Sequence, residues 1–541
     1  MANIFNPFVV CKNIFTACKK DFTLTQGNFT KKRIIPDSVL FPSTSIFATK
    51  VYQIIRKYYF LSNKKIVFQL DSKKPITAVI IGAGNRGKDV YARYALDHPN
   101  ELKIIAVAEP NSERKKQLAE THEIPATLQY ETWQQLFKKS RLADVAFICT
   151  QDQMHTQPAI IALEQGYNVL LEKPMATNLN DCILLVKKAK ETGKQLRIAH
   201  VLRYNRFFST IYDIIQSGRL GEIITIDHRE NVSYFHMAHS FVRGNWSKKE
   251  DSSPMILAKS CHDFDILYWL VGSKPSKLSS FGSLAHFHKN NAPSGAPKRC
   301  TDGCPVADNC EYFAPRIYID IIPLLHIARN SGSIYTRFLS SFALKYPQLT
   351  IRLKSIMSSL QQIDNYKGWP VSTITDDLSL KGKWKALKTG PYGRCVYYCD
   401  NNVVDHQVTI IEFTNKVTAT FTMHGFSHTE GRTIRIDGTK ATLIGEAQTK
   451  ESLKLYNHLK GTEEIIIRDR LEIDQGSGHG GGDRGLIRSF IQSIQSIKNE
   501  DELMTSAKSS LESHLMAFAA DESRLKNQVV QMEKYHNLVQ E

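Results

Sequence analysis

A glycine-rich turn between an apolar run and a helix-like segment constrains this chain more than any other feature. The run Ile76–Ile81 leads directly into Gly82-Ala-Gly-Asn-Arg-Gly87. In such a turn the first glycine permits a sharp bend, the second lets the backbone approach a pyrophosphate, and the third lets the helix pack against the strand. The free amide groups at the start of the helix then hold the anion. The pattern predicts a dinucleotide site that includes Gly82, Gly84, Asn85, Arg86 and Gly87.

A carboxylate follows the next predicted strand. The apolar run Leu102–Ala108 ends at Glu109, 27 residues after Gly82. An acid at this distance accepts both hydroxyls of a ribose, and it would repel a 2′-phosphate. We therefore expect NAD to be preferred, although Arg114 and Lys115 close by leave NADP open as the cofactor.

Strands and helices alternate from Ile76 to about residue 199, which predicts a doubly wound parallel sheet of the Rossmann type. The expected strands are Thr77–Ile81, Leu102–Ala108, Val145–Cys149, Asn168–Leu171 and Gln195–Ala199. The expected helices are Gly87–His98, Ser112–Thr121, Thr132–Lys138, Met154–Gln165 and Leu179–Thr192. Ligands of such a sheet bind beyond the carboxyl ends of its strands, so we assign residues 76–199 to an NAD(P)-binding domain.

The pattern changes after residue 200. Alternating strands such as Ile223–Val232, His406–Phe413 and Val417–His424 predict an α+β domain over residues 200–541 with a mainly antiparallel open sheet. Residues 321–367 read as a basic, helix-prone insertion. Helices should close the chain at Arg484–Lys498 and Ala507–Lys526, capped by Asp483 and Thr505. We expect this domain to bind substrate and to mediate oligomerisation.

The positive charge of the chain lies mostly near its start. Of a net charge of +17, residues 1–75 carry +10, and no basic stripe with interleaved aromatic residues marks the remainder as a nucleic-acid binder. No apolar stretch approaches the roughly 18 residues of a membrane helix, and no secretory signal is evident. Residues 1–75 fit a basic extension of unknown role, with a transit peptide or a membrane-surface helix as alternatives. A cytoplasmic location is expected.

Four short motifs together resemble the Gfo/Idh/MocA oxidoreductases. They are the glycine turn, Ile148-Cys-Thr150 with His155, Leu171-Glu-Lys-Pro174, and the segment His262-Asp-Phe-Asp-Ile-Leu-Tyr-Trp-Leu270. The resemblance covers about residues 76–525. It implies that Lys173 and His262 are catalytic, and that Thr150, His155 and Glu172 contribute to the cofactor site.

The two catalytic candidates also have a physical rationale. Lys173 follows an apolar strand and precedes a proline, so its amine is held in place where it can stabilise an alkoxide. His262 opens an apolar helix, and an imidazole suits proton transfer near neutral pH. A surface lysine and a core histidine are the alternatives.

One position departs from the family pattern. Many relatives carry an aspartate four residues before this histidine, whereas this chain has Ala258 followed by Lys259. Lys259 is therefore a candidate for the substrate pocket. Arg203 and Tyr204 resemble family positions that line the pocket, so they are further substrate candidates. Asp405, His406 and His479 are weaker ones, with polar residues at a sheet edge and a loop with a helix cap as the alternatives.

The cysteines suggest a metal site. Cys300, Cys304 and Cys310 fall within eleven residues, and Cys395 and Cys399 form a second group. Three thiolates with a fourth ligand could hold a structural zinc ion. Because the spacing departs from a CxxC knuckle, disulfides or reduced cysteines remain alternatives.

These observations predict a nicotinamide-dependent oxidoreductase that transfers a hydride to or from a sugar, polyol or related hydroxy compound. One alternative is an enzyme that keeps its dinucleotide bound and uses transient oxidation for elimination or glycoside cleavage. Another is a sensor that binds the dinucleotide without turnover. The expected partner is a small-molecule substrate, and the resemblance implies a homo-oligomer, either a dimer or a tetramer.

Overall fold

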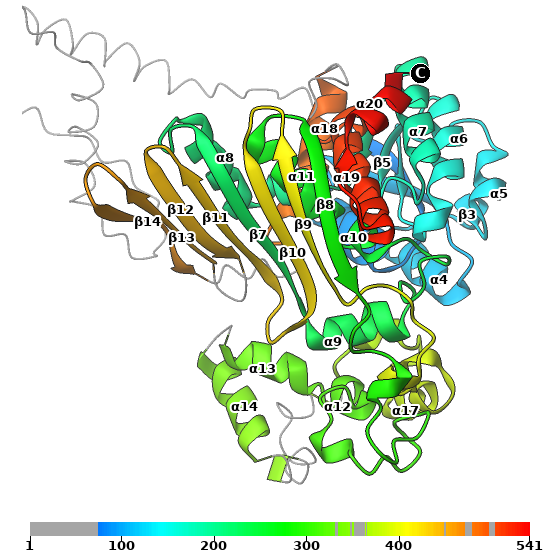
Figure 1. The fold of residues 1–541 in the computed structure, drawn as a ribbon. Coiled ribbons are helices and arrows are strands. Elements are labelled where there is room, and N and C mark those ends of the chain that lie inside the picture. Colours follow the sequence, from blue (N-terminus) through cyan, green and yellow to red (C-terminus); the bar gives the residue numbers. More distant parts are fainter. Residues whose placement is uncertain are drawn as a thin grey trace, which may run out of the picture. The chain divides into compact units, whose positions relative to one another are not determined.

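The computed structural model describes most of the chain after the N-terminal segment. The described residues are 74–330, 334–346, 349–350, 363, 365–447, 451–470, 479–496 and 504–540. The predicted extension, residues 1–75, lies outside them except for its last two residues. The unit that begins at Lys74 contains two sheets (Figure 1). No helix among the described residues is long and apolar enough to cross a membrane.

The first sheet has six parallel strands in the order β3-β2-β1-β4-β5-β6. Its crossovers make it doubly wound, as predicted. The strands are β1 (Ile76–Ile81), β2 (Leu102–Ala108), β3 (Gln129–Tyr130), β4 (Val145–Ile148), β5 (Asn168–Leu171) and β6 (Leu196–Ile198). The short edge strand β3 was not expected from the sequence.

Helices cover both faces of this sheet because alternate strand residues point to opposite faces. Val79 and Ile81 join one apolar core, and Ala78 and Ile80 join the other. The first core includes residues of α5 (Trp133–Phe137), α6 (Thr156–Glu164) and α7 (Leu179–Thr192). The second includes residues of η1 (Asn85–Ala92), α3 (Arg93–Asp97), α4 (Ser112–Thr121) and the C-terminal α18 (Gly482–Gln495).

The second sheet has nine strands in the order β14-β13-β12-β11-β7-β10-β9-β8-β15. All neighbouring strands are antiparallel except β7 and β10, which confirms the predicted α+β domain. The strands are β7 (Ile223–Ser233), β8 (Pro275–Ser283), β9 (His406–Phe413), β10 (Thr418–Ser427), β11 (Gly431–Gly438), β12 (Ala441–Ala447), β13 (Glu451–Asn457), β14 (Thr462–Arg470) and β15 (Val530–Gln531).

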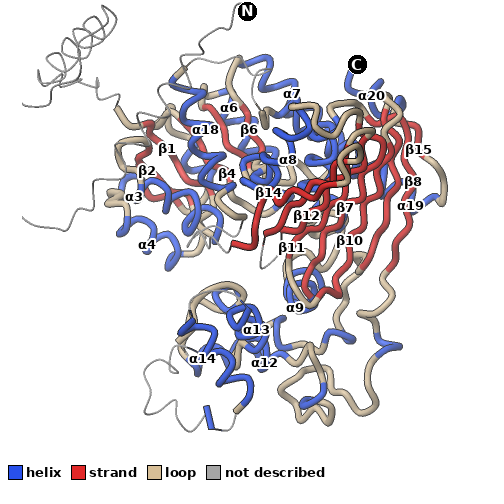
Figure 2. Tube along the Cα trace, turned by 90° about the vertical axis from the view of Figure 1, so that its left-hand side faces the viewer, coloured by secondary structure: helices blue, strands red, loops and turns tan. Residues whose placement is uncertain are grey.

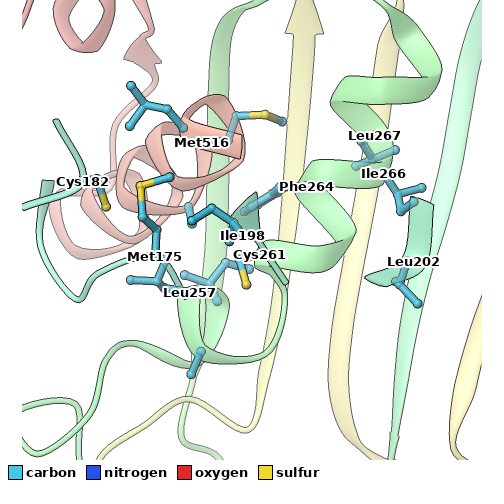
Figure 3. Close-up of a cluster of buried hydrophobic side chains, with 14 of the residues drawn as sticks. Met175, Cys182, Ile198, Leu202, Leu257, Cys261, Phe264, Ile266, Leu267 and Met516 are labelled. Atoms are coloured by element: carbon cyan, nitrogen blue, oxygen red, sulfur yellow. The ribbon is translucent and has the colours of Figure 1, made fainter. Parts of the chain in front are cut away.

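Helices α11 (Cys261–Val271) and α19 (Ala507–Lys526) pack between the two sheets (Figure 1), whereas Figure 2 gives the arrangement of the sheets from the side. Figure 3 shows Phe264 and Cys261 of α11 near Met516 of α19 and Met175 after β5. All four side chains are buried in one apolar core that continues from the first sheet into the second. The core therefore joins the two domains directly.

The insertion in the second domain is longer than predicted. It runs from residue 284 to residue 405, between β8 and β9, and its helices gather at one end of the long sheet in both views (Figures 1 and 2). Its main helices are α12 (Ala314–Tyr318), α13 (Ile322–Asn330), α14 (Ile334–Lys345) and α17 (Leu380–Thr389).

The predicted caps of the last two helices are wrong by one or two residues. Helix α18 begins after Gly481, so Asp483 lies inside its first turn. Helix α19 is capped by Ser506, whose side chain accepts a hydrogen bond from the Ser509 amide, and not by Thr505. The carboxylate of Asp483 instead pairs with Arg86, as described below.

Candidate active site

The glycine turn connects β1 to η1. Gly82 has φ +92°, a conformation that favours glycine, and a Cβ there would lie 2.6 Å from the carbonyl oxygen of Cys149. A Cβ on Gly87 would clash with the carbonyl oxygen of Gly82, whereas a Cβ on Gly84 would meet no atom within 4 Å. The fold itself thus requires Gly82 and Gly87, while the backbone at Gly84 is open to a ligand.

Glu109 ends β2 beside this turn. Its carboxylate is buried and accepts the backbone amides of Ala83 at 2.6 Å and Asn111 at 2.9 Å. A carboxylate has about four acceptor positions, so each oxygen can still accept a ribose hydroxyl. The structure therefore holds the Glu109 carboxylate in a fixed orientation beside the glycine turn.

Arg86 joins the glycine turn to two distant segments. Its Nε lies 2.5 Å from Glu172 Oε1, and its Nη2 lies 2.6 Å from Asp483 Oδ1 in α18. The Tyr91 hydroxyl also donates to Glu172. Burial would raise the pKa of Glu172, but the charge of Arg86, the hydrogen bonds from Tyr91 and Arg86 and the charge of Lys173 together lower it. The sequence offered no signal for Tyr91, and it indicated Asp483 only as a helix cap, because neither residue belongs to a recognised motif.

Lys173 follows Glu172 at the end of β5. Its Nζ donates a 2.7 Å hydrogen bond to the carbonyl oxygen of Ala258, at the end of α10 (Met255–Ala258). The backbone thus supplies an acceptor at the position where relatives carry an aspartate.

His155 supports the same loop. Its ring nitrogens lie 2.7 Å from the carbonyl oxygen of Pro174 and 3.1 Å from that of Thr150. The imidazole is fully buried between these two carbonyl groups. The structure therefore places His155 behind the predicted cofactor site.

His262 lies in a group of imidazoles. Its ring centroid is 5.6 Å from that of His200 and 5.9 Å from that of His479, and His200 in turn is 5.6 Å from His514. The Nδ1 atoms of His262 and His200 are buried without a hydrogen-bond partner. Burial, followed by the nearby charge of Lys173, holds the pKa of His262 well below its ordinary value. His262 is therefore neutral at physiological pH and has a free ring nitrogen.

One large cleft runs along the glycine turn, the strand ends and the second domain, and we call it the cofactor cleft. Gly84, Glu172 and Lys173 line it, but His262 does not. The second domain and its insertion contribute aromatic and small polar side chains on the opposite wall. These include His239, Ser240, Asn245, Trp246, Asn365, Trp369, Ser372, Thr373 and Tyr392.

Lys259 does not line the cofactor cleft. Its Nζ lies 3.1 Å from Glu230 and 3.1 Å from Glu430, while Arg432 pairs with Glu230 and Asp263. Burial alone would lower the pKa of Lys259, but the two glutamates raise it. Its position makes Lys259 part of a buried charge network on the inner face of the second sheet.

Arg203 and Tyr204 are also held elsewhere. All three nitrogens of the Arg203 guanidinium contact protein: Nε and Nη2 donate to Asp265, and Nη1 donates to the carbonyl oxygen of Met504. The Tyr204 hydroxyl lies 3.2 Å from Thr505 Oγ1. These contacts tie η4 (Val201–Tyr204) to α11 and to the segment before α19, and neither side chain is in the lining of the cofactor cleft. Their assignment to the substrate stays a prediction.

Asp405 and His406 lie at the start of β9. The buried carboxylate of Asp405 accepts the amides of Ala285 and His286 and a ring nitrogen of His406 at 2.8 Å. The pair fastens the first residues of the insertion to the sheet. The pair is likewise absent from the lining of the cofactor cleft, and its assignment to the substrate stays a prediction.

The cysteines approach one another without forming a metal site. Cys300, Cys304, Cys310 and Cys395 line one small pocket with Arg243, whose Nη2 is 3.6 Å from Cys300 Sγ. In the part of the chain that the structure describes, no three His, Cys, Asp or Glu side chains are arranged to hold a metal ion, and the cysteines are free. The prediction of zinc at Cys300, Cys304 and Cys310 is not supported, because the Cys300 thiol contacts a buried guanidinium.

Comparison with known proteins identifies the two domains. Residues 76–200 match the NAD-binding Rossmann fold of the oxidoreductase family GFO_IDH_MocA, and residues 213–314 match its C-terminal alpha/beta domain. A 2,7-anhydro-N-acetylneuraminate hydratase of Escherichia coli is 26% identical over 212 residues, which cover 38% of this chain and 53% of that protein. A trans-1,2-dihydrobenzene-1,2-diol dehydrogenase of Bos taurus is 26% identical over 205 residues, covering 38% and 58%.

Solved structures resemble the fold over a longer range. An oxidoreductase of Agrobacterium radiobacter in complex with NAD+, L-tartaric acid and magnesium superposes with a TM-score of 0.56 at 14% identity. That comparison covers 85% of this chain and 99% of the other. In sequence, by contrast, the chain spans about half the length of the curated relatives it matches. With both family domains in order and the expected fold, the chain belongs to the Gfo/Idh/MocA family of oxidoreductases.

Proposed function

We propose that the protein is an NAD-dependent dehydrogenase that oxidises a hydroxyl group of a sugar, polyol or related compound. The observation that carries the proposal is the proximity of Lys173, at the cofactor cleft, to His262, a neutral imidazole with a free buried nitrogen. A reaction that removes a hydride from carbon must also remove the hydroxyl proton, and a positioned imidazole can accept it. The nicotinamide, when bound, would accept the hydride.

Each residue has a defined task in this proposal. The Gly84 backbone and the start of η1 would hold the pyrophosphate, and Glu109 would accept the ribose hydroxyls. Lys173, oriented by the Ala258 carbonyl, would donate to the substrate oxygen as it becomes negative. His262 would take the proton through Nδ1. The aromatic side chains on the opposite wall fit the apolar faces of a sugar ring, and the amides and hydroxyls between them fit its hydroxyl groups.

A second candidate function also has support. A matched relative is named as a hydratase, and Ala258 leaves Lys173 bonded to a backbone carbonyl instead of a carboxylate. Both facts favour an enzyme that retains its dinucleotide and returns the hydride at the end of each cycle. Such an enzyme would release no reduced cofactor.

One experiment separates the two functions. The purified protein is mixed with NAD and a panel of sugars and polyols while the absorbance band of reduced nicotinamide is followed. The dehydrogenase produces a steady rise with at least one compound. Bound dinucleotide in the protein as purified, with consumption of a glycoside or a dehydration substrate and no net reduction, would support the second candidate instead.

The cofactor assignment gives a prediction of its own. Glu109→Ala should weaken NADH binding by about tenfold and NADPH binding by much less, because the carboxylate bonds ribose hydroxyls in one and repels phosphate in the other. Fluorescence titration measures both affinities. Glu113→Ala is the matched control, since its carboxylate accepts a hydrogen bond from Gln117 on the surface of α4. Equal losses for the two dinucleotides would contradict the role of Glu109.

A further inference from the structure

One segment of the insertion crosses the cofactor cleft to reach the first domain. We call residues 365–379 the strap. On one side, Thr373 Oγ1 lies 2.9 Å from Nε2 of His239 in η5 (Met237–Arg243). On the other side, Asp376 Oδ2 accepts a 2.9 Å hydrogen bond from Asn111 Nδ2, and its Oδ1 lies 3.3 Å from Arg114 Nε. The strap is thus attached on both sides of the cleft.

Asn111 links these contacts to Glu109, which does not itself line the cofactor cleft. Asn111 caps α4, and its backbone amide donates to Glu109. The strap residues Lys367, Trp369 and Asp376 line the same cleft as Gly84. A dinucleotide that extends from the glycine turn to Glu109 would therefore lie under the strap.

Arg114 is the cation that could change the choice of cofactor. In related folds, an arginine near this acidic position accommodates the 2′-phosphate of NADP. Here the Nε of Arg114 faces the Asp376 carboxylate. Asp376 also accepts a hydrogen bond from the Asn111 side chain, whose backbone amide donates to Glu109. The strap therefore binds the guanidinium of Arg114, which a 2′-phosphate would require as its positively charged partner.

We propose that Asp376 sets cofactor specificity and retention by drawing Arg114 away from the 2′-position and fastening the strap over the adenosine ribose. The inference rests on the proposed use of NAD. Arg114 and Asp376 are 39% and 43% exposed, and a pair this exposed is individually weak. A weak contact suits the role, because the strap must open for the cofactor to exchange.

The test compares the full-length protein with Asp376→Ala and, as a matched control, Asp377→Ala. Asp377 carries the same charge in the same segment, but its carboxylate accepts the amide of Ser379 within the strap. Stopped-flow fluorescence gives association and dissociation rates for NADH and for NADPH. Asp376→Ala should speed NADH release by about twofold to fivefold and shift the ratio of affinities toward NADPH by a similar factor. Asp377→Ala should change neither.

Other results overturn the proposal. An unchanged affinity ratio in Asp376→Ala, or an equal shift in Asp377→Ala, would remove Asp376 as the determinant. Binding of neither dinucleotide by the wild type would remove this proposal together with the proposed function. Tight NADH binding without oxidation of any hydroxy compound would remove only the dehydrogenase function, and the comparison of the variants would still decide the role of Asp376.

Discussion

Alanine in place of Lys173 or His262 should lower turnover by about a hundredfold or more, the usual scale for losing a positioned acid or base. Lys173 lines the cofactor cleft, and His262 lies near enough to Lys173 for the charge of Lys173 to lower the imidazole pKa. His262 also has a buried ring nitrogen without a hydrogen-bond partner, so we expect both residues to act on the substrate oxygen. Dinucleotide affinity should change little in either variant, because the glycine turn and Glu109 supply those contacts. Steady-state kinetics and NADH titration measure the two effects separately.

Two further variants sharpen this prediction. The double variant should be less impaired than the product of the single losses, because groups that act on one proton and one oxygen are not additive. His458→Ala, at an exposed turn of the second sheet, is the control and should retain full turnover. Normal turnover in either single variant would show that the chemistry takes place elsewhere in the cleft.

Mild acid should unfold the protein. Burial holds the pKa of His200, His239 and His262 well below the ordinary value and lowers that of His514 to about 3. The unfolded chain takes up protons on these histidines below about pH 6.5 while the folded chain does not. Each histidine thus contributes stability that is fully present above that pH and is lost as the pH falls toward its folded pKa. The loss is about 1.4 kcal/mol per pH unit for each.

With four such histidines, the free energy of unfolding should fall by about 5 kcal/mol for each pH unit of acidification. The total free energy of unfolding of a typical protein is only about 5–15 kcal/mol. The melting temperature should therefore fall steeply between about pH 6.5 and 5, above the range in which ordinary carboxyl groups titrate. Thermal unfolding at a series of pH values measures this slope. A flat profile over that range would contradict the prediction.

His514 offers a specific variant for this experiment. Its Nε2 accepts the amide proton of Met175 at 2.8 Å, so protonation at Nε2 would break that hydrogen bond. His514→Gln keeps an acceptor but cannot titrate, and it should reduce the slope by about 1.4 kcal/mol per pH unit. His458→Ala, which removes an exposed histidine, should leave the slope unchanged.

Local signals predicted the first domain well. The bounds of α4 and α7 match the expected Ser112–Thr121 and Leu179–Thr192, because Asn111 and Asn178 cap their starts and Gly193 ends α7 in a left-handed conformation. The strand before the glycine turn and the family membership are likewise confirmed. In each case the information lies within a few residues of the feature it predicts.

Long-range contacts decided the features that the sequence could not reveal. Asp483 looked like a helix cap, but Arg86, almost 400 residues earlier, takes its carboxylate. The sequence indicated Arg203 as a pocket residue, but in the structure its guanidinium is bonded to Asp265. No periodicity or spacing indicates that Asp376 meets Arg114. Which side chains remain available for a ligand depends on such pairings, and only the folded arrangement reveals them. The assigned roles of Lys173, His262 and the cofactor residues remain predictions.

The position of α18 has a consequence for how the chain is made. Leu486, Ile487 and Phe490 complete the apolar layer against one face of the first sheet. A ribosome synthesises that sheet some 300 residues before it reaches this helix. During that interval one apolar face of the nascent first sheet is exposed to solvent, which promotes aggregation or chaperone binding. The first domain can thus complete its core only after α18 has been synthesised, and a premature stop codon before α18 would leave one face of the first sheet without part of its apolar layer.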